Sequence, residues 1–220
     1  MARSRCSQRR CSQHGFLLFV GDGKIEGIET QLNTTGFSPP APGSGGFMDP
    51  QKVVSHFGLV EGMKIADLGS GAGYFTIFLA KAVGENGVVT AIDILDTALE
   101  TLRAKAKAEG LRNIETVRAN LEVPGGSSLN NDSQGIVLLA NILFQSQKKA
   151  EIIAEAKRTL KPGGSLIIID WKKGTSGFGP PDNLRNSPEE MRELVVNNGF
   201  QFANEIDAGV FHFGMVFRKI

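Results

Sequence analysis

Short apolar segments alternate with amphipathic ones along most of the chain. Residues 63–68 form an apolar run that ends in a glycine-rich turn, and residues 74–83 then have apolar positions at helical spacing. The same order returns with a β-rich apolar run at 87–92 and an amphipathic segment at 97–108. An alternation of strands and helices of this kind predicts a mainly parallel sheet covered by helices, which is an α/β fold.

The remaining segments extend this pattern. Further strands are predicted at 114–118, 136–140 and 165–170, and a further helix at 147–160, which Lys-Pro-Gly-Gly then ends. Ser187-Pro188-Glu189-Glu190 has the residues of a capping box and predicts a helix that ends near residue 198. Residues 200–206 and 210–218 predict two strands, and their short connection permits only an antiparallel hairpin.

The glycine-rich turn after the first strand carries the strongest candidate chemistry. It contains Asp67, Gly69, Ser70, Gly71 and Gly73. Glycine tolerates positive φ angles and lets a ligand approach the backbone, which a Cβ would prevent. The N–H groups at the start of the following helix can also hold an anionic group. The turn therefore predicts a ligand site.

The glycine spacing and the next strand narrow the choice of ligand. A dinucleotide fingerprint requires G-x-G-x-x-G, and neither Gly69 nor Gly71 has a third glycine in the required place. Asp93 ends the second strand, where an acidic side chain can bind a ribose diol. The alternative role of Asp93 is a helix cap, although Asp96 or Thr97 is better placed for that.

The pattern Asp67-x-Gly69-x-Gly71-x-Gly73 resembles the first motif of class I S-adenosylmethionine-dependent methyltransferases. The resemblance covers roughly residues 48–220 and includes the Lys-Pro-Gly-Gly turn at 161–164. In layout the chain is similar to the ubiquinone/menaquinone-biosynthesis methyltransferases. The resemblance implies a three-layer, Rossmann-like α/β fold whose seven-stranded sheet has an antiparallel last strand, and S-adenosyl-L-methionine as the cofactor.

The resemblance also implies roles for individual residues. The backbone of the turn would approach the methionine end of the cofactor, Asp67 would orient its amine, and Asp93 would bind the ribose hydroxyls. Asn120 would reach the adenine amino group, although its alternative role is that of a turn residue. The expected cofactor-binding residues are Asp67, Gly69, Ser70, Gly71, Gly73, Asp93, Ile94, Asn120, Leu121 and Asn141.

The methyl acceptor is expected at the carboxyl ends of the parallel strands, because folds of this type bind ligands there. Asn141 follows the fourth strand, and Asp170 with Trp171 ends the fifth. His212 lies near the same edge and is the best candidate for a general base by side-chain chemistry, with a packed strand residue as the alternative. An acidic acceptor would need no base. Asn141 and Asp170 make an incomplete set of metal ligands, so no metal is expected.

Composition and charge fit a small-molecule enzyme. The formal net charge is only +1, and the chain has one Trp and one Tyr. A nucleic-acid substrate is therefore disfavoured, because such proteins usually combine a basic surface with stacking rings. No apolar run approaches the ~18 residues of a membrane span. The sequence says nothing about the oligomeric state.

Residues 1–47 differ in composition from the rest and predict a disordered or non-native leader and linker, with an organellar transit peptide as the alternative. The domain is expected to span 48–220. Both cysteines, Cys6 and Cys11, lie in the leader, where His14 would add a third zinc ligand without a fourth nearby. A domain without cysteines fits a reducing compartment, so a cytoplasmic location is expected.

The sequence thus predicts an enzyme that transfers a methyl group from S-adenosylmethionine to a small-molecule acceptor. The alternatives are methylation of RNA or protein, a module that binds the cofactor without catalysis, and a nicotinamide oxidoreductase. The glycine spacing disfavours the oxidoreductase.

Overall fold

A computed structural model describes residues 48–175 and 177–220. The predictions made for residues 1–47, including those for Cys6, Cys11 and His14, lie outside the described residues.

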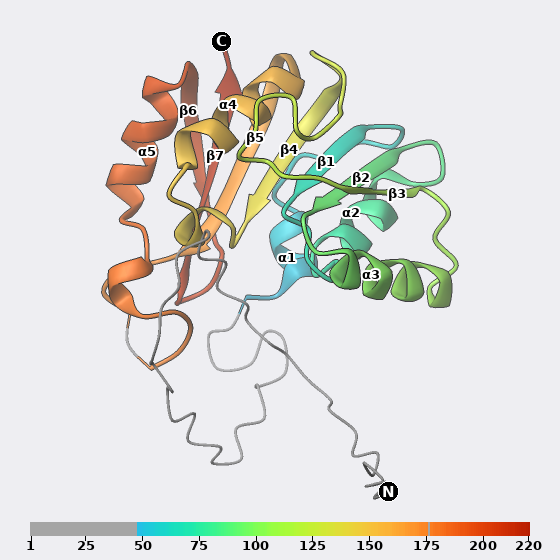
Figure 1. Cartoon of the computed structure of the whole chain (residues 1–220), viewed down its shortest axis with the longest axis horizontal. Helices are drawn as coiled ribbons and strands as arrows, with labels where there is room; N and C mark the ends of the chain where they lie inside the picture. The colour runs from blue at the N-terminus through green and yellow to red at the C-terminus, as the bar shows by residue number, and fades with distance from the viewer. Residues whose placement is uncertain (1–47, 176) are drawn as a thin grey trace, which may run out of the picture. The chain divides into compact units, whose positions relative to one another are not determined.

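Seven strands form one sheet in the order β3-β2-β1-β4-β5-β7-β6 (Figure 1). Strands β1 to β5 pair in parallel, and β7 pairs antiparallel with both β5 and β6. The predicted α/β fold and its antiparallel last strand are therefore confirmed. The strands are β1 (Lys64–Leu68), β2 (Val88–Asp93), β3 (Ile114–Arg118), β4 (Gln134–Ala140), β5 (Leu160–Trp171), β6 (Phe200–Ile206) and β7 (His212–Lys219).

Helices cover both faces of the sheet and create three layers (Figure 1). Side chains of α1 and α2 pack on one face around Ile65, where α3 also joins through Leu102. Side chains of α4 and α5 pack on the other face around Leu68. The helices are α1 (Pro50–Val54), α2 (Thr76–Val83), α3 (Asp96–Ala108), α4 (Lys149–Thr159) and α5 (Pro188–Asn197), with short 3₁₀ turns η1 (Leu143–Gln145) and η2 (Asp182–Leu184).

The helix starts confirm the predicted cap at Ser187, add one at Asp49 and correct the one predicted for α3. Asp49 accepts hydrogen bonds from two amides of α1, and the Ser187 hydroxyl accepts one from Glu190 N at the start of α5. Helix α3 instead begins after Leu95 and has no side-chain cap. The prediction of Asp96 or Thr97 as that cap is therefore wrong, because Asp93 bonds to the Leu95 amide and guides the chain into the helix.

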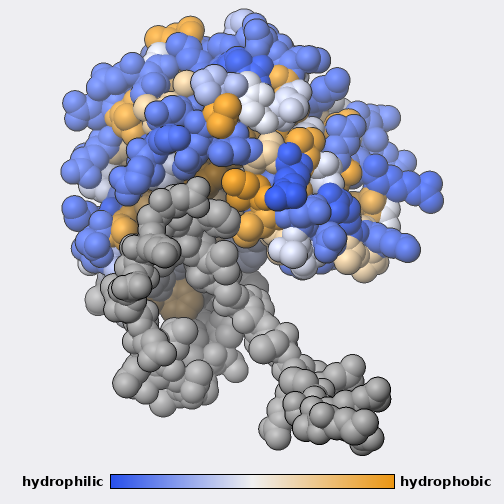
Figure 2. Space-filling view, viewed as in Figure 1, coloured by the Kyte–Doolittle hydropathy of each residue, from blue (hydrophilic) through white to orange (hydrophobic). Residues whose placement is uncertain are grey.

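The carboxyl ends of β1 to β5 meet at one edge of the sheet, together with the start of β7. A depression of about 830 Å³ lies between α5 and β6 and includes Phe202 and Ile220. Hydrophilic residues dominate the described surface on the face that Figure 2 shows. None of the described helices is long and apolar enough to cross a membrane.

Two glycines provide a test of the fold. A Cβ at Gly135 in β4 would meet only Lys64 O, at 3.6 Å. We expect Gly135→Ala to raise the free energy of unfolding by about 0.4–1 kcal/mol, because it restricts the unfolded chain. A Cβ at Gly73 would overlap the Leu102 side chain at a φ of +81°. Gly73→Ala should lower the same quantity by about 1–3 kcal/mol. Urea denaturation measures the free energy of unfolding of both variants. A change in the same direction for Gly135→Ala and Gly73→Ala would contradict the packing described.

Candidate functional site

The glycine turn leaves β1 in a conformation that few other residues adopt. The φ angles of Gly69, Gly71 and Gly73 are +79°, +52° and +81°. L-residues rarely adopt positive φ, so glycine is the residue that fits each position without strain. The turn brings the chain from the end of β1 into α2 within a few residues.

The three glycines meet different surroundings. A Cβ at Gly71 would have no atom within 4 Å. A Cβ at Gly69 would overlap the Ile142 side chain, and one at Gly73 would overlap Leu102. Two of the glycines are thus required by packing as well as by φ, and Gly71 faces open space into which a ligand could enter.

The amides of the turn bond to the protein itself. The N–H groups of Gly69 and Ser70 both donate to Ile92 O, at 2.7 and 3.0 Å. Gly71 N donates to Asp93 Oδ2 at 2.8 Å, and Gly73 N donates to Ser70 O at 3.0 Å. These four turn amides are therefore paired within the protein, whereas the anion site expected at the start of the helix concerns other N–H groups and stays a prediction. A dinucleotide site would instead need such amides for its pyrophosphate.

Asp93 joins the glycine turn to the start of α3. Its Oδ2 accepts the hydrogen bond from Gly71 N, and its Oδ1 accepts one from Leu95 N at 2.9 Å. The side chain is partly exposed at the strand end. Because an ionised carboxylate has about four acceptor positions, Asp93 can still accept hydrogen bonds from two hydroxyl groups. The bonds to Gly71 N and Leu95 N therefore leave room for ribose binding by Asp93, which stays a prediction.

Asp67 lies inside the sheet, just before the turn. It is 2% exposed, and its Oδ2 accepts a hydrogen bond from the Thr76 hydroxyl at 2.6 Å. Burial raises the pKa of Asp67 to about 7, against the lowering effect of Thr76, and the nearby charge of Asp93 raises it further. A cationic amine near this carboxyl group would favour its ionised form.

Ser70 and Asn141 bring two unpaired polar atoms to the same edge. The buried Ser70 Oγ and Asn141 Oδ1 have no hydrogen-bond partner among the described residues. Asn141 also has a φ of +55°, an uncommon value that is enriched at functional sites. Buried polar atoms are usually paired, so these two fit a polar ligand.

The residues expected around adenine lie at the ends of β2 and β3. Leu121 is buried, whereas Ile94 is 42% exposed. Asn120 is exposed, and its Oδ1 accepts a hydrogen bond from Glu122 N at 2.9 Å. This contact is typical of a turn residue, and the remaining lone pair and the amide NH₂ group of Asn120 can still bind a ligand.

Trp171 and His212 form the aromatic part of the edge. They are paired across β5 and β7, and their ring centroids are 4.1 Å apart. Trp171 Nε1 and both His212 ring nitrogens are buried and have no hydrogen-bond partner within the part of the chain that the structure describes. His212 also lines a cavity of about 570 Å³ between the start of α5 and the β6–β7 connection. This volume is in the range of small-molecule pockets.

His212 is an electrically neutral residue at physiological pH. Burial lowers the pKa of His212 to about 4, and the positive charge of Arg185 lowers it as well. The imidazole can therefore accept a proton without first losing one, but it is a weaker base than an exposed histidine.

Two anchors of the segment 172–186 could not be foreseen from the sequence. The buried Asp170 accepts hydrogen bonds from Phe144 N and Asn186 Nδ2, both at 2.9 Å, and burial raises its pKa to about 7. Arg185 donates to Pro180 O at 2.9 Å and also to the carbonyls of Thr175 and Phe178. Arg185 is one of three cations in this glycine- and proline-rich segment, and nothing in the sequence distinguishes it from Lys172 and Lys173.

No group of three or more acidic, cysteine or histidine side chains in residues 48–175 and 177–220 could hold a metal ion. The site therefore consists of a backbone turn, two carboxyl groups, unpaired polar atoms and an aromatic pair. The fold and these elements define an α/β protein that binds a nucleoside-containing ligand at the strand ends.

Comparisons with known proteins agree with this class. Residues 59–209 match a family described as "Methyltransferase domain". The ubiquinone/menaquinone biosynthesis C-methyltransferase UbiE of Shewanella pealeana is 36% identical over 122 residues, which are 55% of this chain and 47% of the relative. The demethylmenaquinone methyltransferase of Lactococcus lactis is 31% identical over 125 residues, which are 56% of this chain and 48% of the relative. The chain thus spans about half the length of these curated relatives.

A solved structure is similar over a larger share of both chains. The crystal structure of a SAM-dependent methyltransferase from Aquifex aeolicus has a TM-score of 0.72 and 31% identity, covering 79% of this chain and 91% of that one. The chain belongs to the class I S-adenosylmethionine-dependent methyltransferase family, and S-adenosyl-L-methionine is the cofactor of this family.

The neutral state of His212 leads to a testable pH dependence. Between pH 6.5 and 4 the unfolded chain binds a proton at this histidine that the folded chain does not, so stability must fall as pH decreases. The free energy of unfolding of wild type minus that of His212→Phe should decrease by about 3 kcal/mol over this interval. Urea denaturation at each pH measures the free energy of unfolding of both proteins. If this free energy changes with pH in the same way for wild type and His212→Phe, the neutral, buried imidazole is contradicted.

Proposed function

We propose that this protein transfers the methyl group of S-adenosylmethionine to a small-molecule acceptor. The observation that carries the proposal is the open space beside Gly71, next to a carboxylate that retains free acceptor positions. The sulfonium of the cofactor supplies an activated methyl group. The protein has to bind the nucleoside, hold the acceptor in line with that methyl group and exclude water, and such positioning can contribute about 7–11 kcal/mol.

We assign the cofactor contacts to the residues named from the sequence. Asp93 binds the ribose hydroxyls, and Asp67 orients the amine of the methionine part. The backbone at Gly69, Ser70 and Gly71 lies along the same part. The remaining contacts are assigned to Gly73, Ile94, Asn120, Leu121 and Asn141. The unpaired oxygens of Ser70 and Asn141 support this assignment, because a polar ligand would satisfy both.

We propose a quinone-type ring as the acceptor. The names of the matched relatives refer to ubiquinone, menaquinone and demethylmenaquinone. The adjacent, mutually tilted rings of Trp171 and His212 offer an aromatic wall with N–H and N groups for ring oxygens. The segment 172–186, anchored by Asp170 and Arg185, lies beside this pair and would close the acceptor side.

The weak basicity of His212 restricts the chemistry of the acceptor. A base with a pKa of about 4 removes a proton efficiently only from an acidic group. The phenolic hydroxyl of a reduced quinone ring has an ordinary pKa of about 10, so a small fraction loses its proton to solvent at neutral pH. The resulting phenolate activates the neighbouring ring carbon, which loses its own proton to solvent after it has accepted the methyl group. We therefore assign His212 to hydrogen bonding with the acceptor oxygen, with proton transfer as a secondary role.

The near-neutral charge of the chain supports a small acceptor over RNA or protein. The amides of the turn support S-adenosylmethionine over a nicotinamide dinucleotide, because they bond within the protein. We place the enzyme in the cytoplasm, since residues 48–220 contain no cysteine that would indicate an oxidising compartment.

Labelled methyl transfer tests the proposed acceptor. The full chain is incubated with S-adenosylmethionine carrying a labelled methyl group and, in separate reactions, with demethylmenaquinol, total RNA or a protein extract. We expect label in the solvent-extracted quinol only. Label found only in RNA or only in protein would overturn the proposed small-molecule acceptor. Binding of the cofactor without any methyl transfer would support the non-catalytic alternative.

The assignment of Asp93 is tested by calorimetry. We expect Asp93→Ala to weaken binding of S-adenosylmethionine by about 1–3 kcal/mol, because it removes charge-assisted hydrogen bonds. The matched control is Asp96→Ala, which removes an exposed acid from the first turn of α3 and its ion pair with Arg103. An unchanged dissociation constant in Asp93→Ala, with a folded domain, would remove Asp93 from the cofactor site.

A further inference from the structure

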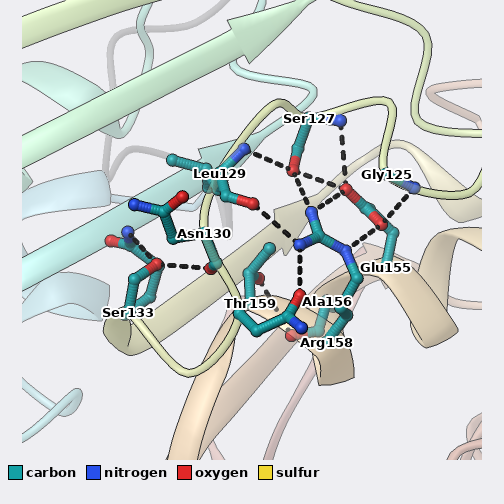
Figure 3. A network of polar contacts seen from close by, with 11 residues as sticks. Gly125, Ser127, Leu129, Asn130, Ser133, Glu155, Ala156, Arg158 and Thr159 are labelled. Carbon is teal, nitrogen blue, oxygen red and sulfur yellow. Dashed lines mark hydrogen bonds and ion pairs between the residues drawn. The ribbon is translucent and has the colours of Figure 1, made fainter.

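A buried ion pair connects α4 to the segment that follows β3 (Figure 3). Glu155 of α4 is only 2% exposed, and Arg158, one helical turn later, is partly exposed. The Arg158 guanidinium donates to Glu155 through Nε at 2.9 Å and through Nη2 at 2.7 Å. This two-bond contact fixes both side chains relative to each other.

Both members of the pair also bind the segment 125–131. Glu155 accepts hydrogen bonds from Gly125 N and Ser127 N, both at 3.0 Å, and from the Ser127 hydroxyl. Arg158 donates to Leu129 O and Asn131 Oδ1, both at 2.7 Å. The pair therefore holds four residues of one segment, three of them through the backbone.

The charge state of Glu155 supports a permanent anchor. Burial would raise the pKa of Glu155, but hydrogen bonds from Arg158, Ser127 and Gly125 outweigh burial and lower the pKa to about 2. The carboxylate is thus ionised at every pH at which an enzyme of this kind works. Its contacts do not switch with pH.

The anchored segment packs directly against residues assigned to the adenine side of the cofactor. Residues 119–133 connect β3 to β4 without a helix, and Asn120 and Leu121 lie near their start. Gly126 lies between the two anchored residues Gly125 and Ser127, and a Cβ at Gly126 would overlap Asn120 O. Gly126 N also donates to Val123 O at 2.8 Å. A displacement of Gly125 and Ser127 would therefore be transmitted to the backbone of Asn120.

We propose that Glu155 and Arg158 are positioning residues for the nucleoside end of the cofactor, which they influence by holding the segment 125–131 against Asn120. This inference rests on the proposed function, since it takes Asn120 and Leu121 as adenine-side residues. The pair itself does not contact the cofactor. It determines where the chain runs after β3, in a connection that has no helix to give it rigidity.

A purely structural role for the pair would give a different result. An ion pair that only stabilises the fold would change the free energy of unfolding and leave the affinity of the folded protein unchanged. A positioning role changes the affinity for any ligand that contains adenosine. It leaves kcat at saturating cofactor and the KM for the acceptor near their wild-type values.

The test uses the full chain with the variants Glu155→Gln, Arg158→Lys and Ser127→Ala. Glu155→Gln removes the negative charge of the pair, and Arg158→Lys replaces the planar guanidinium group with an ammonium group. Ser127→Ala is a milder change that removes one hydroxyl. Calorimetry at a temperature where each variant is folded gives its affinity for S-adenosylhomocysteine. We expect about 3- to 30-fold weaker binding for the first two variants and a smaller loss for the third.

A second ligand locates the effect within the cofactor. Methylthioadenosine keeps the nucleoside and lacks the amino-acid end, so its affinity should fall by the same factor in each variant. The matched control is Glu109→Gln, which breaks the exposed ion pair between α2 and the end of α3, Lys81–Glu109, and should bind both ligands like wild type.

The outcomes separate this inference from the proposed function. If wild type binds S-adenosylhomocysteine and the folded variants bind it equally well, the positioning role is wrong and the proposed function stands. A loss for S-adenosylhomocysteine without a loss for methylthioadenosine would also overturn it, because the effect would then lie at the amino-acid end. Failure of wild type to bind either ligand would overturn the proposed function and this inference together.

Discussion

The hydrogen bond between Gly71 N and Asp93 Oδ2 is the contact on which the arrangement of the site depends. It joins the turn after β1 to the end of β2, and the second oxygen of the same carboxylate holds the first residues before α3. Because both strands are parallel neighbours, the turn and the strand end must lie at one edge. The Asp93 carboxylate thereby holds the backbone of Gly71 in place. The open space beside Gly71 and the free acceptor positions of Asp93 are thus kept next to each other.

The sequence predicted the α/β fold because strands and helices follow from local patterns. Strand β3 was predicted with the observed bounds, the short final connection predicted the antiparallel pair, and the seven-stranded sheet was implied by the family resemblance. The individual roles of Gly69 and Gly73 were not predictable. Their constraint comes from Ile142 and Leu102, which are distant in sequence, and packing of this kind has no local signature.

Asp93 and Asp170 illustrate the same limit for polar residues. The sequence treated ribose binding and capping by Asp93 as alternatives, but a carboxylate with two oxygens performs the local role and keeps capacity for another. Asp170 was expected only as a residue that points to the acceptor. Its contacts with Phe144 and Asn186 depend on two connections that meet in space, so only the structure reveals them as anchors.

The two sides of the strand-end edge differ in how they are held, and this difference has a chemical reason. On the side that we assign to the nucleoside, the carboxyl group of Asp93 and backbone amides hold the turn, and Glu155 holds the connection one step further away. The opposite side has a neutral imidazole packed against Trp171 at a tilt of 39° and a cation, Arg185, 5.6 Å from the centroid of the Trp171 ring. Transfer of a methyl group from a sulfonium to an oxygen-activated carbon disperses charge rather than creating it. For the acceptor proposed above, a neutral aromatic wall with nearby positive charge would stabilise an anionic ring without trapping the cationic donor, so this chemistry would require rigid, charged elements on the nucleoside side only.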